Sequence, residues 1–454
     1  MNEKLFNRNF TLLLLGQVFS LIGNYTLKFA LSMYVLEQTG SASIFAGLLA
    51  VATVPQVLLA PIGGLLADRL NRRNMMVALD AFSGTAVFLT LLGICGFHGT
   101  SGFHGTSGFH GTGGFHGTGG FHGTGGFHGT SWAHLPGQEG PILLLIGILQ
   151  VVLGILGAFE SPTVQACVRQ MQTGENLLKG NAAVSQVQAV AGLVTPFLGS
   201  LFYTAVGIRP VLAVCAACFF LTALLECFIR LRFQRRPGGQ KVRQILRQDL
   251  GESKDFLLKK RPEVFRLLLL AALASFFVVG TAVVGLPFLV RNVLGLSAGH
   301  YGAAESLIGG ASVAGALMVG LLAGRLQKNG LQSLLIMAGA VLIPAGAAFL
   351  LPLSVIVRYL LLLACFCIAQ AVCSMFSVLA LSMIQESTPE HLTGKIMACV
   401  IALSTCAQPA GQVIYGLLFD LFSESVWPVL LPTAAALMAL GCLSAGFLKR
   451  FTKE

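Results

Sequence analysis

The chain has 454 residues, of which 55% are hydrophobic and only 10% are charged, and its mean hydropathy is +0.80. A soluble protein of this length needs many more charged residues to cover its surface, so the composition excludes an ordinary soluble enzyme or binding module. The formal net charge of +11 would suit a nucleic-acid partner, but the distribution of the basic residues along the chain argues against one.

Twelve apolar segments follow one another, each about 20 residues long and therefore able to cross the hydrocarbon of a bilayer. We predict an all-α membrane protein whose 12 transmembrane helices cover residues 10–36, 43–67, 75–95, 141–162, 181–205, 210–232, 264–290, 298–323, 331–352, 355–384, 393–420 and 425–448.

The basic residues predict how the chain is oriented. If the N-terminus is cytoplasmic, Arg209, Arg291 and Arg358 lie at outer ends and Lys28 lies within the first span. The other 25 of the 29 Lys and Arg residues then fall in cytoplasmic segments or at their edges. The positive-inside rule therefore predicts a multi-pass protein of the cell membrane with both termini in the cytoplasm. The lipid bilayer, and no nucleic acid, is the expected partner of this basic charge.

The first span carries Lys28 in its outer half. An intramembrane lysine either faces a cavity or a partner, or it snorkels to the outer interface, and both interpretations stay open. The span shows no convincing cleavage site, so we interpret it as a retained helix. The short outer turn Thr39-Gly40-Ser41 follows it.

The turn between the second and third spans combines glycines, an acid and arginines. The glycines let neighbouring backbones approach closely, the acid could cap the start of another helix, and the arginines hold the turn in the cytoplasm. These residues are Gly63, Gly64, Asp68, Arg69, Arg72 and Arg73. In the third span, Asp80 is expected to pair with the arginines of this turn.

A hexapeptide repeat of Gly-Phe-His-Gly-Thr-(Ser/Gly) fills residues 97–131. Its glycine content and lack of aliphatic residues predict disorder in an outer loop. We interpret the tract as a repeat expansion in a tolerant loop and expect no metal site. The alternative is a metal-binding tract, since imidazole is a common metal ligand, with the ligands His98, His104, His110, His116, His122 and His128.

The fourth and fifth spans contain an acid and two prolines. Glu160 is expected near the cytoplasmic end of the fourth helix, which Pro162 should break. In the fifth span, Pro196 and Gly199 are predicted to allow a kink and close packing.

Glu226 lies in the sixth span, and a long basic link follows it. The spacing of apolar residues within 242–250 predicts an interfacial helix there. We therefore divide the chain into an N-terminal six-helix half (1–232), a basic cytoplasmic linker (233–263) and a C-terminal six-helix half (264–454).

The second half repeats features of the first. Glu305 lies in the outer third of the eighth span. Gly320 and Arg325 form a weaker copy of the first turn, with Gly324 in place of its acid. Pro409 in the eleventh span is a further predicted kink.

The two turns resemble the signature loop of the major facilitator superfamily of secondary transporters and its repeat between the eighth and ninth helices. The resemblance implies two halves that rock about a site near the membrane midplane, in a monomer. Thr39-Gly40-Ser41 resembles a turn of the drug-efflux branch, and the segment from Thr195 to Gly199 resembles a degenerate antiporter motif. The nearest branch comprises multidrug and macrolide efflux permeases and siderophore exporters.

This resemblance implies export of a bulky, amphipathic organic substrate in exchange for protons. A proton carrier should be a carboxylate whose burial favours its neutral form, and Glu160 and Glu226 are our first choices. The full set of candidate coupling or substrate residues is Lys28, Asp80, Glu160, Glu226 and Glu305.

Other functions stay open: a siderophore or metabolite exporter, a membrane sensor that moves nothing, and a metal-handling protein. The sequence contains no Walker motif, nucleotide-binding fold or Gly-x-Ser-x-Gly elbow, so we expect neither an enzyme nor a cofactor. The eleven cysteines lie in or beside predicted helices, where we expect no structural disulfide.

Overall fold

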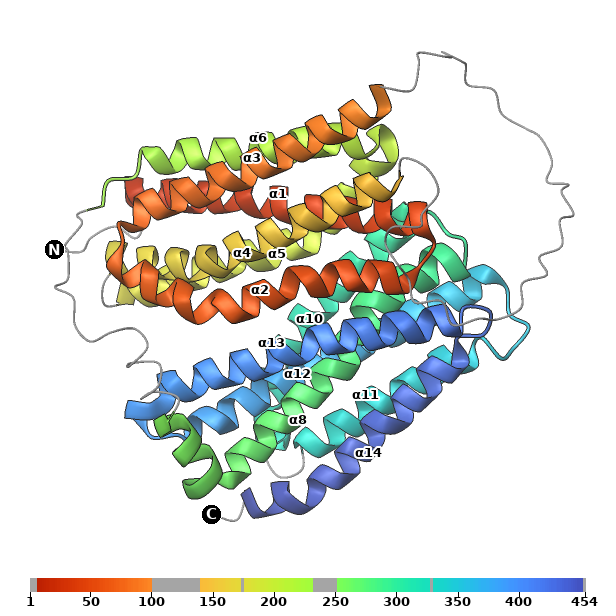
Figure 1. Ribbon diagram of the computed structural model, residues 1–454. Coiled ribbons are helices and arrows are strands. Elements are labelled where there is room, and N and C mark those ends of the chain that lie inside the picture. Colours follow the sequence, from red (N-terminus) through yellow and green to blue (C-terminus); the bar gives the residue numbers. More distant parts are fainter. Residues whose placement is uncertain (1–5, 100–138, 173–174, 232–250, 327–329, 452–454) are drawn as a thin grey trace, which may run out of the picture.

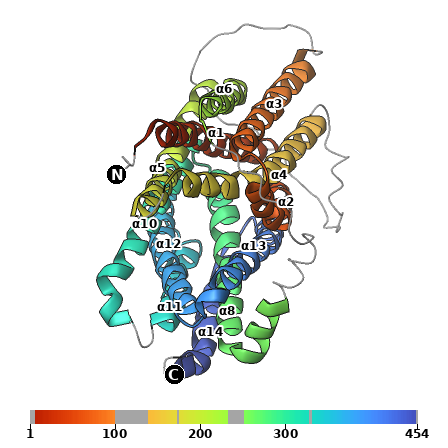
Figure 2. The same cartoon turned by 90° about the vertical axis from the view of Figure 1, so that its left-hand side faces the viewer.

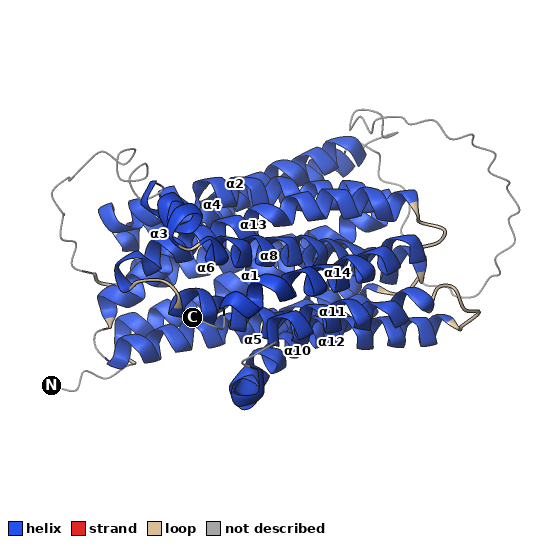
Figure 3. Ribbon diagram, turned by 90° about the horizontal axis from the view of Figure 1, so that it is seen from below, coloured by secondary structure: helices blue, strands red, loops and turns tan. Residues whose placement is uncertain are grey.

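The computed structural model describes residues 6–99, 139–172, 175–231, 251–326 and 330–451. All regular secondary structure in these segments is helical (Figure 3). Within them, twelve helical spans are long and apolar enough to cross a membrane, which confirms the predicted fold class. The predicted interfacial helix around residues 242–250 and most of the histidine tract lie outside the described segments.

The first six helices are α1 (Arg8–Thr39), α2 (Ala42–Arg69), α3 (Arg72–Gly99), α4 (Glu139–Met171), α5 (Glu175–Val206) and α6 (Ile208–Cys227). The Asn7 side chain starts α1 by accepting a hydrogen bond of 2.9 Å from the Phe10 amide. Gly40 ends α1 in the left-handed conformation, with φ of 61°, which glycine adopts without strain. Ser41 then caps α2.

In the second set, a π-helical turn, η2 (Phe256–Lys260), precedes the seventh span. The seventh span is built from four consecutive pieces, which are α8 (Pro262–Val279), the π-helical η3 (Gly280–Gly285), α9 (Leu286–Phe288) and the π-helical η4 (Leu289–Val293). The remaining helices are α10 (Ala298–Leu326), α11 (Gly330–Ala347), α12 (Val355–Glu386), α13 (Glu390–Leu421) and α14 (Trp427–Phe451).

Pro162 does not break the fourth helix, because α4 runs through it to Met171. The prediction of a break there was wrong for a physical reason. A proline at position 162 leaves the carbonyl of Ala158 without its helical hydrogen bond. Gly63 of α2 packs directly on that carbonyl oxygen, which a Cβ at position 63 would strike. A close Cα–H contact therefore covers the freed carbonyl, and neighbouring helices commonly compensate membrane prolines in this way.

The same relationship recurs at Pro196, which lies inside α5. This proline frees the carbonyl of Gly192, and Gly309 of α10 faces it, since a Cβ built at Gly309 would lie 3.5 Å from the Gly192 oxygen. Here the covering glycine comes from the other set of helices. Helix α13 likewise continues through Pro409.

The helices form two groups (Figures 1 and 2). In one group, α2 packs on α4, α3 on α6, and α1 on both α5 and α6. In the other, α11 packs on α12 and α14, α10 on α12, and α8 on α13. The two groups touch chiefly through α2 with α13 and α5 with α10. We call the end of the bundle that carries both chain termini the terminal side, and the opposite end the distal side.

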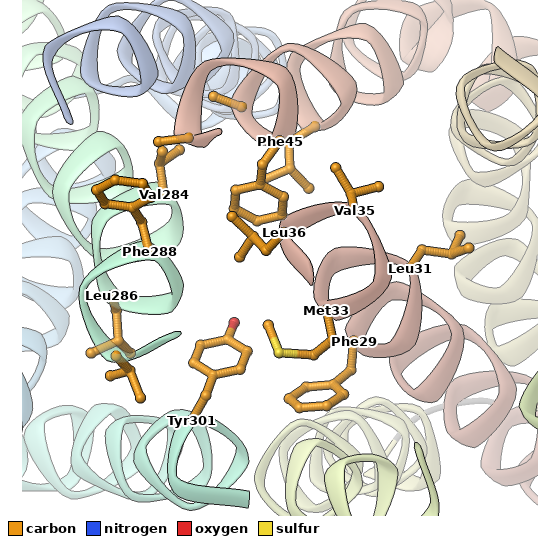
Figure 4. Close-up of a cluster of buried hydrophobic side chains, with 14 of the residues drawn as sticks. Phe29, Leu31, Met33, Val35, Leu36, Phe45, Val284, Leu286, Phe288 and Tyr301 are labelled. Carbon is orange, nitrogen blue, oxygen red and sulfur yellow. The ribbon is translucent and has the colours of Figure 1, made fainter. Parts of the chain in front are cut away.

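The hydrophobic core has a different form on the two sides. On the distal side, one cluster joins both groups, with Phe29, Met33 and Leu36 of α1 facing Leu286 and Tyr301 (Figure 4). On the terminal side there are two separate clusters. One surrounds the start of α1 and belongs to the first group, and the other surrounds η2 and α8 and belongs to the second. The helix groups are therefore joined distally, and in Figure 1 they diverge towards the terminal side.

Candidate functional site

Four helices of the first group bring acidic side chains together. Asp80 of α3, Glu160 of α4 and Glu226 of α6 meet beside Ser20 of α1, and we call these four residues the carboxyl cluster. Asp80, Glu226 and Ser20 are buried, with exposed fractions of 2%, 1% and 1%. Glu160 is partly buried. Three of the five candidate ionisable residues thus lie in one place.

The Ser20 hydroxyl connects two of the carboxyl groups. Its Oγ lies 3.1 Å from Asp80 Oδ1 and 3.1 Å from Glu160 Oε1. A serine hydroxyl has one proton to donate, so it can donate to only one of these oxygens. The other contact is a hydrogen bond only if the second carboxyl group donates to Ser20. This geometry therefore suits a cluster that holds at least one proton.

Coulomb repulsion favours the same state. Because each oxygen lies 3.1 Å from Ser20 Oγ, the Asp80 and Glu160 oxygens are at most 6.2 Å apart. Two negative charges at that distance repel by about 3 kcal/mol at an effective dielectric constant of about 20. Burial adds a desolvation cost for each further charge.

Glu226 completes the cluster from α6. It interacts with Asp80 and, electrostatically, with Glu160. Its Oε2 is buried and has no hydrogen-bond partner in the described part of the protein. Gly16 allows this approach, since it faces the Thr222 and Glu226 side chains, and the Thr222 hydroxyl donates to the Gly16 carbonyl oxygen over 3.1 Å.

Asp80 pairs with neither Arg72 nor Arg73, contrary to the prediction for these two described arginines of the preceding turn. Arg72 donates instead to the carbonyl oxygen of Ala166 at 3.1 Å and to Gln170 at 3.0 Å, and Arg73 donates to the carbonyl oxygen of Cys227. Cys227 ends α6 and Gln170 lies in the last turn of α4, where the helix dipole favours a cation. Arg72 and Arg73 thus bind near helix ends, while Asp80 is buried and interacts with Ser20.

The other two candidate residues lie elsewhere. Lys28 of α1 and Glu305 of α10 come from different helix groups and attract each other electrostatically. Glu305 also interacts with Tyr301, one helical turn before it. This charged pair is separate from the carboxyl cluster.

Of the predicted gating turn, the structure describes the packing of Gly63 and the contacts of Arg72 and Arg73. The side chains of Asp68, Arg69 and Arg325, and the surroundings of Gly64 and Gly320, lie outside what it describes.

The described residues contain no group of three His, Cys, Asp or Glu side chains arranged to hold a metal ion. The carboxyl cluster is not such a group either. The histidine tract beyond residue 99 lies outside the described segments, as does the side chain of His98. All eleven cysteines are free.

A set of polar contacts that the sequence did not reveal joins the helix groups on the distal side. Glu37 of α1 pairs with Arg291 of η4 and accepts a hydrogen bond of 2.6 Å from the Tyr203 hydroxyl. Asn292 donates to the Gly40 carbonyl oxygen over 2.9 Å. Asp420 of α13 accepts hydrogen bonds at the start of α2. The one available signal was the position of Arg291 and Asp420 beside predicted outer loops.

Ser20, which the sequence analysis also missed, is an ordinary small polar residue in an apolar helix. Nothing in its immediate sequence distinguishes it from Ser32, whose hydroxyl donates to the backbone of its own helix.

The twelve spans form two groups that are joined distally and divided on the terminal side, and a buried carboxyl cluster lies within the first group. This architecture defines a multi-pass membrane protein of the transporter type. The family profile of the Major Facilitator Superfamily matches residues 13–411, and the chain belongs to that superfamily. The chain is 21% identical over 431 residues to macrolide efflux protein A of Streptococcus pyogenes, covering 94% of this chain and 93% of that protein.

Solved structures show the same fold. A bacterial homologue of the iron transporter ferroportin in an inward-facing state superimposes with a TM-score of 0.67 at 16% identity, covering 98% of this chain and 99% of that one. The nucleoside transporter NupG superimposes with a TM-score of 0.65 at 12% identity, covering 98% and 100%. The named substrates of these proteins differ, so the likeness concerns the fold.

Proposed function

We propose that this protein is a secondary active transporter that exports bulky, amphipathic organic compounds of the drug or macrolide type in exchange for protons. The observation that carries the proton coupling is the position of Ser20 Oγ, 3.1 Å from both Asp80 and Glu160. One hydroxyl proton cannot serve both oxygens, so a carboxyl proton belongs to the arrangement. The substrate class is supported by the similarity to a macrolide efflux protein.

In this proposal the carboxyl cluster alternates between a protonated and a more ionised state. Loading a proton removes a buried charge, and releasing it restores the repulsion among three acids. Either change alters how favourably α1, α3, α4 and α6 pack, which couples the protonation state to the rocking of the two helix groups.

The arrangement of the two helix groups fits the inward-facing step of that cycle. With both termini in the cytoplasm, as the basic residues predict, the distal side faces outward and the terminal side faces inward. The joined distal core and the divided terminal clusters then correspond to an inward-facing state, from which a cytoplasmic substrate would enter.

Two measurements test the proposal. Cells that express the protein should accumulate less of a cationic dye and of a macrolide, and a proton uncoupler should abolish the difference. If neither compound changes, multidrug export is discarded and siderophores or metabolites become the next substrates to test.

The second measurement concerns the cluster. In proteoliposomes, Glu226→Gln, Asp80→Asn and Glu160→Gln should each uncouple substrate movement from proton movement, whereas Glu424→Gln should not. Glu424 is an exposed acid beyond the end of α13 and serves as the matched control. Intact proton coupling in all three cluster variants would remove the cluster as the proton site.

A further inference from the structure

The Phe29–Tyr301 stack links the two helix groups at the distal closure. The ring centroids lie 5.3 Å apart, the planes are inclined by only 17°, and both side chains are buried. Figure 4 shows Phe29 of α1 and Tyr301 of α10 next to each other where the two helix groups meet. The stack is therefore part of the seal that closes the distal side.

Two opposite charges lie just on the terminal side of this stack. Helix α1 runs from the terminal to the distal side, so Lys28 comes immediately before Phe29. Helix α10 runs the other way, so Glu305 lies one turn beyond Tyr301 towards the terminal side. Both charges thus lie on the terminal side of the stack, between it and the contact of Gly309 with α5.

The two charges attract each other but are held apart. Lys28 is exposed although its neighbours Leu27 and Phe29 are only 1% and 4% exposed. Its charge acts electrostatically on Glu305 in the opposite helix group. The structure shows no direct ion pair between these two described residues, so the ammonium group and the carboxylate attract each other without a hydrogen bond.

Polar atoms in this region lack partners. Glu305 Oε2 and Ser306 Oγ are both buried, and neither has a hydrogen-bond partner among the described residues. A buried acceptor that makes no hydrogen bond destabilises the protein, and more strongly when it is charged. A ligand N–H at Glu305 Oε2 would remove that cost, while Lys28 offers a donor to an acceptor on the same ligand.

We propose that Lys28 and Glu305 select amphoteric substrates, whose cationic amine binds Glu305 and whose anionic group binds Lys28. This inference rests on the proposed transport function and narrows its substrate class. A compound with only one charge would leave either Lys28 or Glu305 without an opposite charge. A purely cationic compound would also be repelled by Lys28, and a purely anionic one by Glu305. An amphoteric compound satisfies both groups at once.

The test measures binding to the purified protein in lipid nanodiscs and needs no transport. Three matched fluorescent probes share one apolar body: a fluoroquinolone with free amine and carboxylate, its carboxyl ester, and its N-acetyl derivative. The wild type should bind the amphoteric probe about tenfold more tightly than either singly charged probe, which corresponds to 1.4 kcal/mol. Equal affinity for the three probes, or binding of none, overturns the proposal without any variant being made.

Variants then assign the charges. Lys28→Gln should abolish the preference over the ester, and Glu305→Gln should abolish the preference over the N-acetyl probe. The charge-swapped double variant Lys28→Glu/Glu305→Lys should regain the amphoteric preference that each single reversal loses. Equal weakening of all three probes in both single variants, or no recovery in the double variant, would contradict the assignment.

Proton release from the same nanodiscs separates this inference from the proposed function. If the probe preference is lost while the carboxyl cluster still titrates with substrate, only the amphoteric selection fails. If the preference persists and no proton moves, the charged pair stands and proton coupling fails.

Discussion

Asp420, at the distal end of α13, caps the start of α2 through Ala42. Its Oδ1 accepts a hydrogen bond of 2.7 Å from the Ala42 amide. Its Oδ2 accepts from the Ser41 hydroxyl at 2.6 Å and from the Ser43 amide at 2.9 Å. A carboxylate from one helix group thus satisfies the free amides and complements the dipole of a helix in the other group. This contact holds the distal side closed.

We predict that Asp420→Asn shifts the protein towards a distally open state. The variant keeps the shape of the side chain but loses the charge, and hydrogen bonds to charged groups are worth about 1 kcal/mol more than neutral ones. Spin labels at positions 209 and 355, exposed at the distal ends of α6 and α12, would report the change as a longer distance in a cysteine-free background. Glu424→Gln is the control, and an unchanged distance distribution in Asp420→Asn contradicts the role.

Glu37 and Arg291 form the second distal link between the groups. Their side chains are 34% and 21% exposed, so we expect a coupling free energy of only about 1 kcal/mol. Glu37→Gln, Arg291→Gln and the double variant form a double-mutant cycle, with the closed fraction from the spin-label distances as the measured quantity. Strictly additive effects would mean that the pair contributes nothing to closure.

Ser20→Ala should reduce proton-coupled transport about tenfold, because the two acids lose the hydroxyl that bridges them, and such a hydrogen bond contributes about 1.5 kcal/mol. Ser20→Thr keeps the hydroxyl and should retain coupling, at some cost in stability from the extra methyl group. Substrate-driven proton release from proteoliposomes is the measurement. Equal coupling in the alanine variant and the wild type would show that the bridge is dispensable.

Gly63→Ala should destabilise the protein by about 1–3 kcal/mol, because the new Cβ would strike the Ala158 carbonyl oxygen and push α2 away from α4. The matched control is Gly96→Ala in α3, where a Cβ meets nothing within 4 Å. That control should be neutral or slightly stabilising, since alanine is the better helix former. Thermal unfolding in detergent compares the two, and equal midpoints would contradict the packing argument.

The exception at Pro162 illustrates where sequence reasoning ends. A proline inside an apolar run predicts a helix end, and in water that rule usually holds. Here Gly63, about a hundred residues earlier in the chain, covers the carbonyl that the proline frees. The freed carbonyl is covered only because α2 and α4 pack against each other. No pattern in the sequence around Pro162 indicates that packing.

By itself, the sequence determined the number of membrane spans and, through the placement of lysine and arginine, the predicted orientation. Both depend on the composition of each segment, because each segment enters the bilayer according to its own hydropathy and the basic charge at its ends. Only the tertiary structure decided which polar residues meet. The rotation of each helix about its axis follows from side-chain packing, and apolar residues surround nearly every membrane helix, so hydropathy carries little information about it. That rotation brought Asp80, Glu160 and Glu226 to Ser20, and separated Lys28 and Glu305 from them.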